Sequence, residues 1–291
     1  MTKVLITGAT GNVGIELIKS LNSINHQLDL YAGVRDLEND SKKLSAYKIK
    51  LKHFDFMGMS SYELALTNCD ILFLLRPPQL SDVKKYFKPI IDTALKCNIK
   101  HIEFLSVQGV ENSKIIPHHK IERLIVESKI PYTFLRPAYF MQNFTTTLRN
   151  DLVNKKRIYL PAGKAKFTLI DVRDIGTVSA IILNDTSLHA NMSYELTSNK
   201  KLTFQEMANT LSTLLGVSIQ YQSPNLFNFY RTKRKEKVEP IFILVMIMLH
   251  YFPRFQKGPV TTNWVEKILN RKPRRSDQIM GNFMTTILCM C

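Results

Sequence analysis

Along the first two thirds of the chain, the pattern of apolar and polar residues switches repeatedly between short runs typical of strands and longer stretches typical of helices. Short runs rich in β-branched and aromatic residues are typical of strands, and six occur here: KVLIT, LDLYAGV, IKLKHF, DILFLL, HIEFLS and YTFLR. Each is followed by a stretch with helical periodicity, which indicates a parallel sheet with helices on both faces. The segment ILFLL is apolar throughout, as expected for a strand covered on both sides. We therefore expect an α/β fold with a doubly wound parallel sheet.

The pattern changes after the sixth predicted strand. Turn residues and short extended pieces precede a helix predicted over about 172–183, and MSYELTS (192–198) is one more predicted strand. Thr203 and Glu206 have the spacing of a capping box that begins a further helix, and Gly216 is its predicted stop. We expect a first domain over residues 1–150, with elements near 166–198 interleaving with it, and a smaller, mostly helical domain over 151–291.

The longest apolar run, IFILVMIMLHYF (241–252), has 12 residues, whereas a bilayer crossing takes about 20. No membrane span is predicted. Basic residues on both sides leave an interfacial helix as an alternative, but we favour a buried helix of the smaller domain.

Composition and charge narrow the class of protein. A chain of 291 residues that is 45% hydrophobic buries a sizeable core. Its formal net charge of +16 favours polyanions, but the two densest basic clusters (231–237 and 271–275) have no zinc-finger or RNA-binding pattern beside them. We interpret these clusters as solvated faces and expect no specific nucleic-acid partner.

The cysteines indicate no disulfide framework and no zinc site. Cys69, Cys97, Cys289 and Cys291 stand at unrelated spacings. No signal-peptide pattern precedes the strand that includes Val4. We expect reduced thiols and a cytoplasmic protein, and we leave the oligomeric state open.

The glycine loop in VLITGATGNVGIEL is the candidate with the clearest chemistry. Gly8, Gly11 and Gly14 lie between a predicted strand and a predicted helix. In a Rossmann-type fold such glycines permit a tight turn, a close approach to a pyrophosphate and close helix packing. The free N–H groups of the helix start then face the anion. We expect a dinucleotide site; the alternative is an ordinary glycine-rich turn.

The end of the second strand bears on which dinucleotide binds. Arg35 suits a 2′-phosphate, whereas Asp36 could bind ribose hydroxyls or simply begin the next turn. This favours NADP (NADPH) over NAD.

Several segments, in order, resemble one known family. They are GATGNVG, GVRD, HFDF, FLLRPP, HIEFLSVQGVE, HHKIERLIVESKIPYTFLRPAYFMQNF and DVRDIG. They are similar to the NmrA-like branch of the atypical short-chain dehydrogenases/reductases, which includes NAD(P)H-dependent quinone reductases and azoreductase-like proteins. The resemblance covers roughly residues 3–275 and is most specific over 118–144. It does not extend to the C-terminal residues with Cys289 and Cys291.

The resemblance implies a set of cofactor contacts. Phosphate contacts are implied for Thr10, Gly11, Asn12 and Val13, and a 2′-phosphate contact for Arg35. Adenine is implied to lie between Asp55 and Phe56, and the rest of the cofactor to lie along Leu74, Leu75 and Arg76. From the residues alone, Asp55 could equally be a helix cap or turn acid. Arg76 precedes two prolines at a strand end, where ligands bind, or is a surface charge.

The proton-transfer pair of ordinary short-chain dehydrogenases, a tyrosine four residues before a lysine, is missing. None of the eleven tyrosines has lysine four places on. Aligning the helix on Glu122 places His118 at the lysine position and Lys114 at the tyrosine position. A positioned acid is typically worth about 10²–10⁴-fold in carbonyl reduction, whereas a quinone accepts hydride readily and its product oxygens take protons from water. The missing pair therefore favours a quinone or similar electrophile, or no reaction at all.

Two residues are the candidate catalytic groups. The resemblance places His118 near the nicotinamide ribose; alternatively it donates to a substrate oxygen, or is a partly buried helix histidine. With Glu122 it offers only two ligands, so we expect no metal. Ser106 ends the fifth strand and could bind the nicotinamide or substrate, or cap the strand.

The segment AYFMQNF supplies the expected substrate pocket. Tyr139, Phe140 and Met141 offer an apolar surface for an aromatic ring and Asn143 a polar group, although at least one aromatic is expected to seal the junction between domains. We expect an NADPH-dependent oxidoreductase that passes hydride to a quinone-like acceptor. The alternative is a redox sensor that binds NADP(H) and acts through protein partners.

Overall fold

The computed structural model describes residues 1–274, so Cys289 and Cys291 lie outside the described residues. The chain forms two compact units. Unit 1 consists of Met1–Pro137, Val172–Leu196 and Trp264–Arg271. Unit 2 consists of Ala138–Asp171, Thr197–Asn263 and, among the described residues, 272–274. Residue 150, where we expected the domain border, lies in unit 2.

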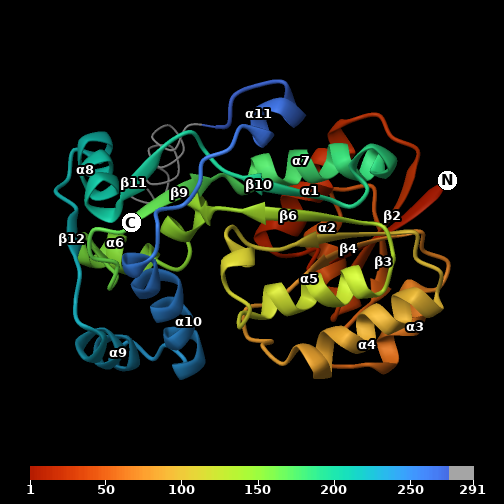
Figure 1. Ribbon diagram of the computed structural model, residues 1–291, viewed down its shortest axis with the longest axis horizontal. Helices are drawn as coiled ribbons and strands as arrows, with labels where there is room; N and C mark the ends of the chain where they lie inside the picture. The colour runs from red at the N-terminus through yellow and green to blue at the C-terminus, as the bar shows by residue number, and fades with distance from the viewer. Residues whose placement is uncertain (275–291) are drawn as a thin grey trace. The chain divides into compact units, whose positions relative to one another are not determined.

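Unit 1 is built on a seven-stranded parallel sheet (Figure 1). Its strands are β1 (Thr2–Thr7), β2 (Leu28–Val34), β3 (Lys50–His53), β4 (Ile71–Leu75), β5 (His101–Leu105), β6 (Tyr132–Pro137) and β10 (Met192–Leu196). They are ordered β10-β6-β5-β4-β1-β2-β3, and every neighbouring pair is parallel. The predicted α/β fold with a doubly wound Rossmann-type sheet is confirmed.

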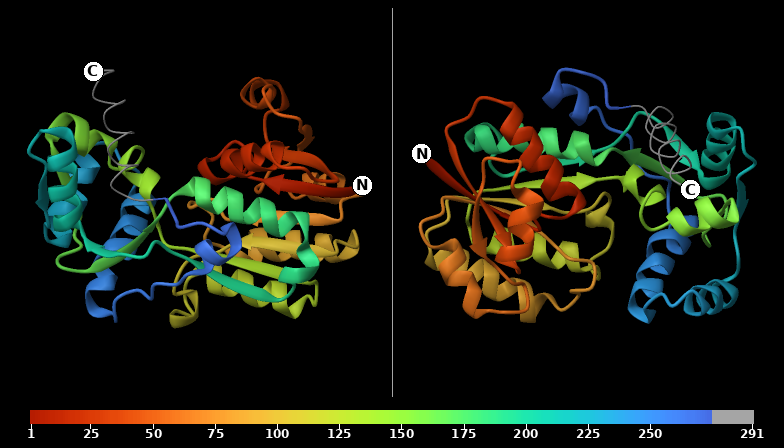
Figure 2. Two further views of the ribbon diagram at one scale, coloured as in Figure 1. Left: turned by 90° about the horizontal axis from the view of Figure 1, so that it is seen from above. Right: turned by 180° about the vertical axis from the view of Figure 1, so that it is seen from behind.

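Helices cover both faces of this sheet (Figures 1 and 2). They are α1 (Asn12–Ser23), α2 (Leu37–Leu44), α3 (Ser60–Leu66), α4 (Val83–Lys96), α5 (Pro117–Glu127), α7 (Val172–Asn184) and α11 (Trp264–Leu269). Helices α3, α4 and α5 pack against one face with a core rich in phenylalanine, including Phe54, Phe87 and Phe104. On the other face α7 lies against α1 at Gly176, where a Cβ atom would stand 2.5 Å from the backbone carbon of Glu16.

The chain reverses its direction of winding between β1 and β4. These strands are neighbours in the sheet but far apart in sequence. The Thr7 hydroxyl joins their ends: it donates to the Phe73 carbonyl (2.9 Å) and accepts from the Leu75 N–H (3.2 Å). Ligands of open parallel sheets bind outside the carboxyl ends of the strands at such a point.

Unit 2 combines short strands with four helices in its described part. A three-stranded sheet contains β7 (Tyr139–Phe140), β9 (Lys166–Ile170) and β11 (Lys201–Thr203), and a pair contains β8 (Arg157–Tyr159) and β12 (Gln220–Gln222). The helices are α6 (Arg149–Lys155), α8 (Phe204–Leu215), α9 (Leu226–Lys235) and α10 (Pro240–Tyr251). A short 3₁₀ helix, η4 (Phe252–Phe255), follows α10.

The helix predicted from Thr203 to Gly216 is confirmed as α8. Thr203 accepts from the Glu206 N–H (3.2 Å), and the Glu206 carboxylate accepts from the Thr203 N–H (2.7 Å). Gly216 ends the helix with a left-handed φ of 62°. Sequence-local chemistry therefore sets both ends of this helix.

The expectation that the apolar run 241–252 forms a buried helix is wrong. The run does form α10, but the helix buries only Ile243, Met246 and His250. Its other positions are half-buried or exposed, because unit 2 packs against one side of this helix. Within residues 1–274 no helix has the length and apolar character needed to cross a membrane.

Candidate functional site

The glycine loop connects β1 to α1 through a turn that excludes larger residues. Gly8 has a φ of +61°, and a Cβ atom there would stand 2.4 Å from Leu75 Cδ2. The Gly11 N–H donates to the Gly8 carbonyl (2.9 Å). A Cβ atom on Gly14 would stand 2.3 Å from that same carbonyl oxygen. Two of the glycines thus have no room for a side chain, as a loop that lets helix and ligand approach the backbone requires.

The start of α1 is free to receive an anion. Its N-cap, Gly11, provides no side-chain hydrogen bond, and the first turn contains no acidic residue. The first N–H groups of a helix have no partner within the helix, and the helix dipole gives them a positive potential. Thr10, Asn12 and Val13, for which phosphate contacts are expected, surround this helix start.

Arg35 and Asp36 follow β2 and differ in how they are engaged. Asp36 is the N-cap of α2 and accepts from the Asn39 N–H (3.0 Å) and Asn39 Nδ2 (2.6 Å). These hydrogen bonds lower the pKa of Asp36. Arg35 is exposed and makes no hydrogen bond or ion pair with a described residue. The acid thus begins the next helix, while the guanidinium remains available.

Asp55 and Phe56 follow β3. The Asp55 carboxylate accepts from the Met57 N–H (2.9 Å), so it acts as a turn acid in this structure. Phe56 packs edge-on against Phe54, with ring centroids 4.9 Å apart, and it also meets Phe87. The structure therefore gives both residues a role in holding the loop after β3.

The end of β4 brings Leu75 to the glycine loop, and Arg76 directly follows it. Leu74 is buried in the core, whereas Leu75 lies beside Gly8. Arg76 Nη1 donates to the carbonyls of Pro77 (3.2 Å), Pro78 (3.0 Å) and Leu80 (2.9 Å). Burial lowers the pKa of Arg76 to about 10. Arg76 is therefore not a free surface charge: it holds the proline loop after β4 in place.

His118 lies next to Arg76. Arg76 Nε stands 3.4 Å from His118 Nε2, and the pKa of His118 is lowered to about 3 by burial and by the Arg76 charge. The imidazole is therefore neutral at pH 7, and its Nε2 atom faces a donor. His118 lies in the first turn of α5, whereas Lys114 precedes that helix.

Ser106 directly follows β5 and is 5% exposed. Its hydroxyl has no hydrogen-bond partner among the described residues. Buried hydroxyl groups are usually paired in native proteins, so this oxygen has capacity for a ligand at the carboxyl edge of the sheet.

Glu122 has a structural partner. It receives a two-pronged hydrogen bond from Arg136, with Nη2 at 2.7 Å and Nε at 3.1 Å. This pair ties α5 to β6. Residues 1–274 contain no group of three or more His, Cys, Asp or Glu residues that could hold a metal ion.

The expected pocket segment begins unit 2. Met141 is 2% exposed and lies in the core of this unit, so the expectation that it offers a surface is wrong. Phe140 and Asn143 are half-buried. The Tyr139 ring stands edge-on to three aromatic rings of the same unit. Burial raises the pKa of Tyr139, which a hydrogen bond with Asn143 only partly offsets.

Two polar residues beside these elements escaped the sequence analysis. His250 Nε2 lies 3.3 Å from the Tyr139 hydroxyl, and its Nδ1 lies 2.6 Å from the Met246 carbonyl. Burial lowers the pKa of His250 to about 4, so it is neutral at pH 7. Thr7, which joins β1 to β4, is the other. Each is a single polar residue in an apolar run of the sequence, and this position could have indicated a buried polar side chain that needs a partner.

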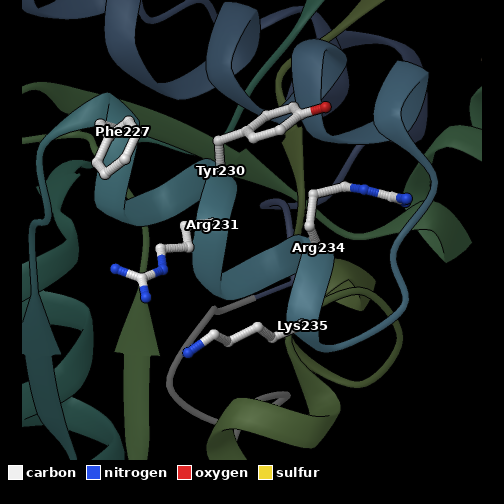
Figure 3. Close-up of a pocket in the computed structure, with 5 residues that line it drawn as sticks. All are labelled: Phe227, Tyr230, Arg231, Arg234 and Lys235. Atoms are coloured by element: carbon white, nitrogen blue, oxygen red, sulfur yellow. The ribbon is translucent and has the colours of Figure 1, made fainter.

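A hollow on unit 2 does not involve these groups. It is lined by five α9 residues, Phe227, Tyr230, Arg231, Arg234 and Lys235 (Figure 3). All five belong to unit 2, whereas the glycine loop belongs to unit 1. The hollow and the glycine loop therefore belong to different units.

A family model and sequence relatives match most of the chain. The model of the NmrA-like family matches residues 1–242. Prestalk A differentiation protein A of Dictyostelium discoideum is 27% identical over 75% of this chain and 71% of its own length. NAD(P)H azoreductase of Xenophilus azovorans is 27% identical over 75% and 76%, and quinone oxidoreductase 2 of Escherichia coli is 24% identical over 76% and 77%.

Solved structures share the fold. Triphenylmethane reductase of Citrobacter sp. superposes with a TM-score of 0.85 at 22% identity, over 97% of this chain and 99% of that protein. The E. coli NADPH-dependent quinone oxidoreductase in complex with NADPH gives 0.82 at 19% identity, over 97% and 99%. NmrA, a negative transcriptional regulator in complex with NADP, gives 0.72 at 17% identity, over 96% and 94%.

Proposed function

Because this chain belongs to the NmrA-like family, we propose that it binds NADPH and passes hydride to a quinone-like or other electrophilic aromatic acceptor. Relatives named as an azoreductase and a quinone oxidoreductase support this reaction class. Structural neighbours in complex with NADP(H) support the cofactor.

The observation that carries the proposal is the fit of unit 1 to a dinucleotide phosphate. Gly8 and Gly14 exclude side chains from the loop, and the start of α1 has no internal cap. Uncapped N–H groups and the helix dipole suit a pyrophosphate. Leu75 borders the loop from the neighbouring strand β4. In this proposal Thr10, Asn12 and Val13 hold the phosphates.

NADPH would supply the hydride. In this proposal the chain's own contribution is positioning, because none of its tyrosines has a lysine four places on. Neutral His118 accepts from Arg76 and can donate through its other ring nitrogen. The Ser106 hydroxyl, which has no partner within residues 1–274, can orient the nicotinamide amide or a substrate oxygen. Product oxygens then take their protons from water.

Arg35 is proposed to bind the 2′-phosphate, because its side chain is exposed and has no partner among the described residues, while Asp36 caps α2. Arg35→Ala is expected to raise the Kd for NADPH by about 10–100-fold, the value of one charged hydrogen-bonded contact. The Kd for NADH should change by less than about twofold. Fluorescence titration of both cofactors measures the difference, with Lys42→Ala on α2 as the matched control. Equal losses for NADPH and NADH would remove Arg35 from this role.

His118 is expected to leave no imprint on the pH profile near neutrality. Its pKa is lowered to about 3, so the ring does not titrate between pH 5.5 and about 8.5. His118→Gln should lower kcat/KM by a factor that stays constant over that range. The measurement is NADPH oxidation with one quinone at each pH. If His118 were instead a proton donor, wild-type activity would fall above its pKa and the variant would lack that limb.

Turnover itself is tested by steady-state oxidation of NADPH with a panel of quinones, azo dyes and triphenylmethane dyes. Reduction of at least one acceptor, lost in a Gly14→Ala variant, is the expected result. No turnover with any acceptor, together with tight NADPH binding, would contradict the enzyme and leave the cofactor site standing.

A second candidate function is supported by the similarity to NmrA, a negative transcriptional regulator whose structure holds NADP. In that function the chain senses the redox state of the cofactor and acts through protein partners. A preference of tenfold or more for NADP⁺ or NADPH without turnover would favour it. Equal affinity for both forms with measurable turnover would favour the reductase.

A further inference from the structure

Helix α10 carries an exposed apolar face opposite the side that unit 2 buries. Three α10 residues on that side, Ile241, Leu244 and Met248, and Phe252 directly after the helix are at helical spacing and between 37 and 54% exposed. A helix that covers a core on one side ordinarily carries polar residues on the other. The second apolar face therefore does not serve the packing of unit 2 as far as that unit is described (138–171, 197–263 and 272–274).

Helix α9, which contacts α10, adds aromatic and basic side chains. Its buried side holds Phe229 and Lys233. The opposite side carries Phe227, Tyr230, Arg231 and Arg234 at the spacing i, i+3, i+4 and i+7, and Figure 3 shows them with Lys235 around the hollow. Arg231 and Lys235 make no ion pair or hydrogen bond through their side chains with a described residue. Their charges are available to a partner.

The charge around this surface is strongly positive. Exposed Lys237 precedes α10, and exposed Arg254 and Lys257 follow it. Residues 226–257, all of which the structure describes, contain two acidic residues. Glu239 is exposed, whereas Glu236 is half-buried and paired with Lys155 and Lys233. A partner that fits here offers both anionic groups and an apolar phase.

We propose that these residues of α9, α10 and η4, the α9–α10 face, dock on the surface of a bilayer that contains anionic phospholipid. Basic residues attract such a surface, aromatic rings favour its interface, and apolar side chains insert below the headgroups. The 12 residues of α10 span about 18 Å, less than a hydrocarbon core of about 30 Å. The helix therefore lies along the interface.

Other occupants suit the α9–α10 face less well. In a symmetric dimer the same patch meets itself, so basic residues at the ends of α10 would face basic residues of the other copy. A nucleic acid would engage Arg231 and Lys235 through phosphates, but it would leave Leu244 and Met248 in water. Of these three occupants, a lipid surface is the one that uses both kinds of side chain.

The test is co-sedimentation of the full chain with vesicles of phosphatidylcholine containing 30% phosphatidylserine, compared with pure phosphatidylcholine. We expect binding at least tenfold stronger to the anionic vesicles and weakened by salt. The double variant Arg231→Glu/Lys235→Glu should lose at least tenfold, and so should Leu244→Ser/Met248→Ser. Matched controls in unit 1, Lys48→Glu/Lys84→Glu and Leu64→Ser/Leu188→Ser, should bind as the wild type does. Thermal melts verify that each variant is folded.

Three results would overturn the proposal. One is anionic-vesicle binding that neither α9–α10 variant reduces, or no binding at all. Another is a dimer in sedimentation velocity that Leu244→Ser/Met248→Ser dissociates, without vesicle binding, which assigns the face to a second copy. The third is salt-sensitive binding to duplex DNA, without vesicle binding, that needs Arg231 and Lys235 but not Leu244 and Met248.

Discussion

Replacing Gly14 with alanine is expected to raise the Kd for NADPH by up to about 150-fold, since forcing a side chain into a filled site costs about 1–3 kcal/mol. The new Cβ atom would stand 2.3 Å from the Gly8 carbonyl oxygen and 2.8 Å from the Ala9 Cα atom. Both neighbours are backbone, so no rotamer change can relieve the overlap. The loop and α1 must separate, and the N–H groups at the helix start move away from the phosphates.

Isothermal titration with NADPH measures this effect, with Gly258→Ala as the matched control. A Cβ atom on Gly258 would meet nothing within 4 Å, so that variant should bind as the wild type does. Circular dichroism of Gly14→Ala separates lost binding from lost folding. Unchanged NADPH affinity in a folded Gly14→Ala protein would show that the cofactor does not approach this loop.

The second large effect is expected in unit 2, where Asp151 and Lys233 form a buried ion pair. Asp151 is 1% and Lys233 4% exposed, and Lys233 Nζ donates to Asp151 Oδ2. Arg157 Nε also donates to this carboxylate (2.9 Å). Asp151→Asn keeps the shape but leaves two cations facing a neutral amide. Breaking a buried pair from one side costs about 3–5 kcal/mol, and because Glu236 still accepts from Lys233 (2.8 Å) we expect about 3 kcal/mol.

Urea denaturation at pH 7 measures the loss, and Asp92→Asn is its control. Asp92 pairs with Lys88 on α4, where both side chains are more than half exposed, so the control should cost less than about 1 kcal/mol.

The pH dependence of the stability gives a further check. Burial opposes ionisation of Asp151, but the hydrogen bonds from Lys233 and Arg157 outweigh it and lower the pKa. Its stabilisation is therefore present above the unfolded pKa and is lost as the pH falls through the folded pKa. Asp151→Asn should lack that acid-dependent loss, whereas identical pH profiles would show that the pair contributes little.

The parts of the fold that depend on neighbours in sequence could be predicted. Strands and helices follow the apolar pattern, α8 begins and ends at its predicted capping residues, and the glycine loop falls between β1 and α1. In each case the residues that specify an element belong to it or directly flank it in sequence, so the local pattern is sufficient to predict the element.

Features that depend on distant partners could not be predicted. Lys233 belongs to a basic cluster that we interpreted as solvated, yet it is buried, because its partner Asp151 lies 82 positions away. His118 meets Arg76 across 42 positions, and that contact sets its charge state. In α10 every position from 241 to 249 is apolar, so the sequence pattern does not indicate which side of the helix faces the core.

The division of the chain into units also limits how this protein could have been assembled. The polypeptide passes between the units after Pro137, Asp171, Leu196, Asn263 and Arg271. The edge strand β10 and the helix α7, whose Gly176 fits against α1, are made only after unit 2 has begun. During synthesis, α1 therefore remains uncovered by α7 until residues 138–184 have followed the first segment of unit 1. Because the segments of the two units interleave along the chain, a single recombination event could not exchange one unit and leave the other whole.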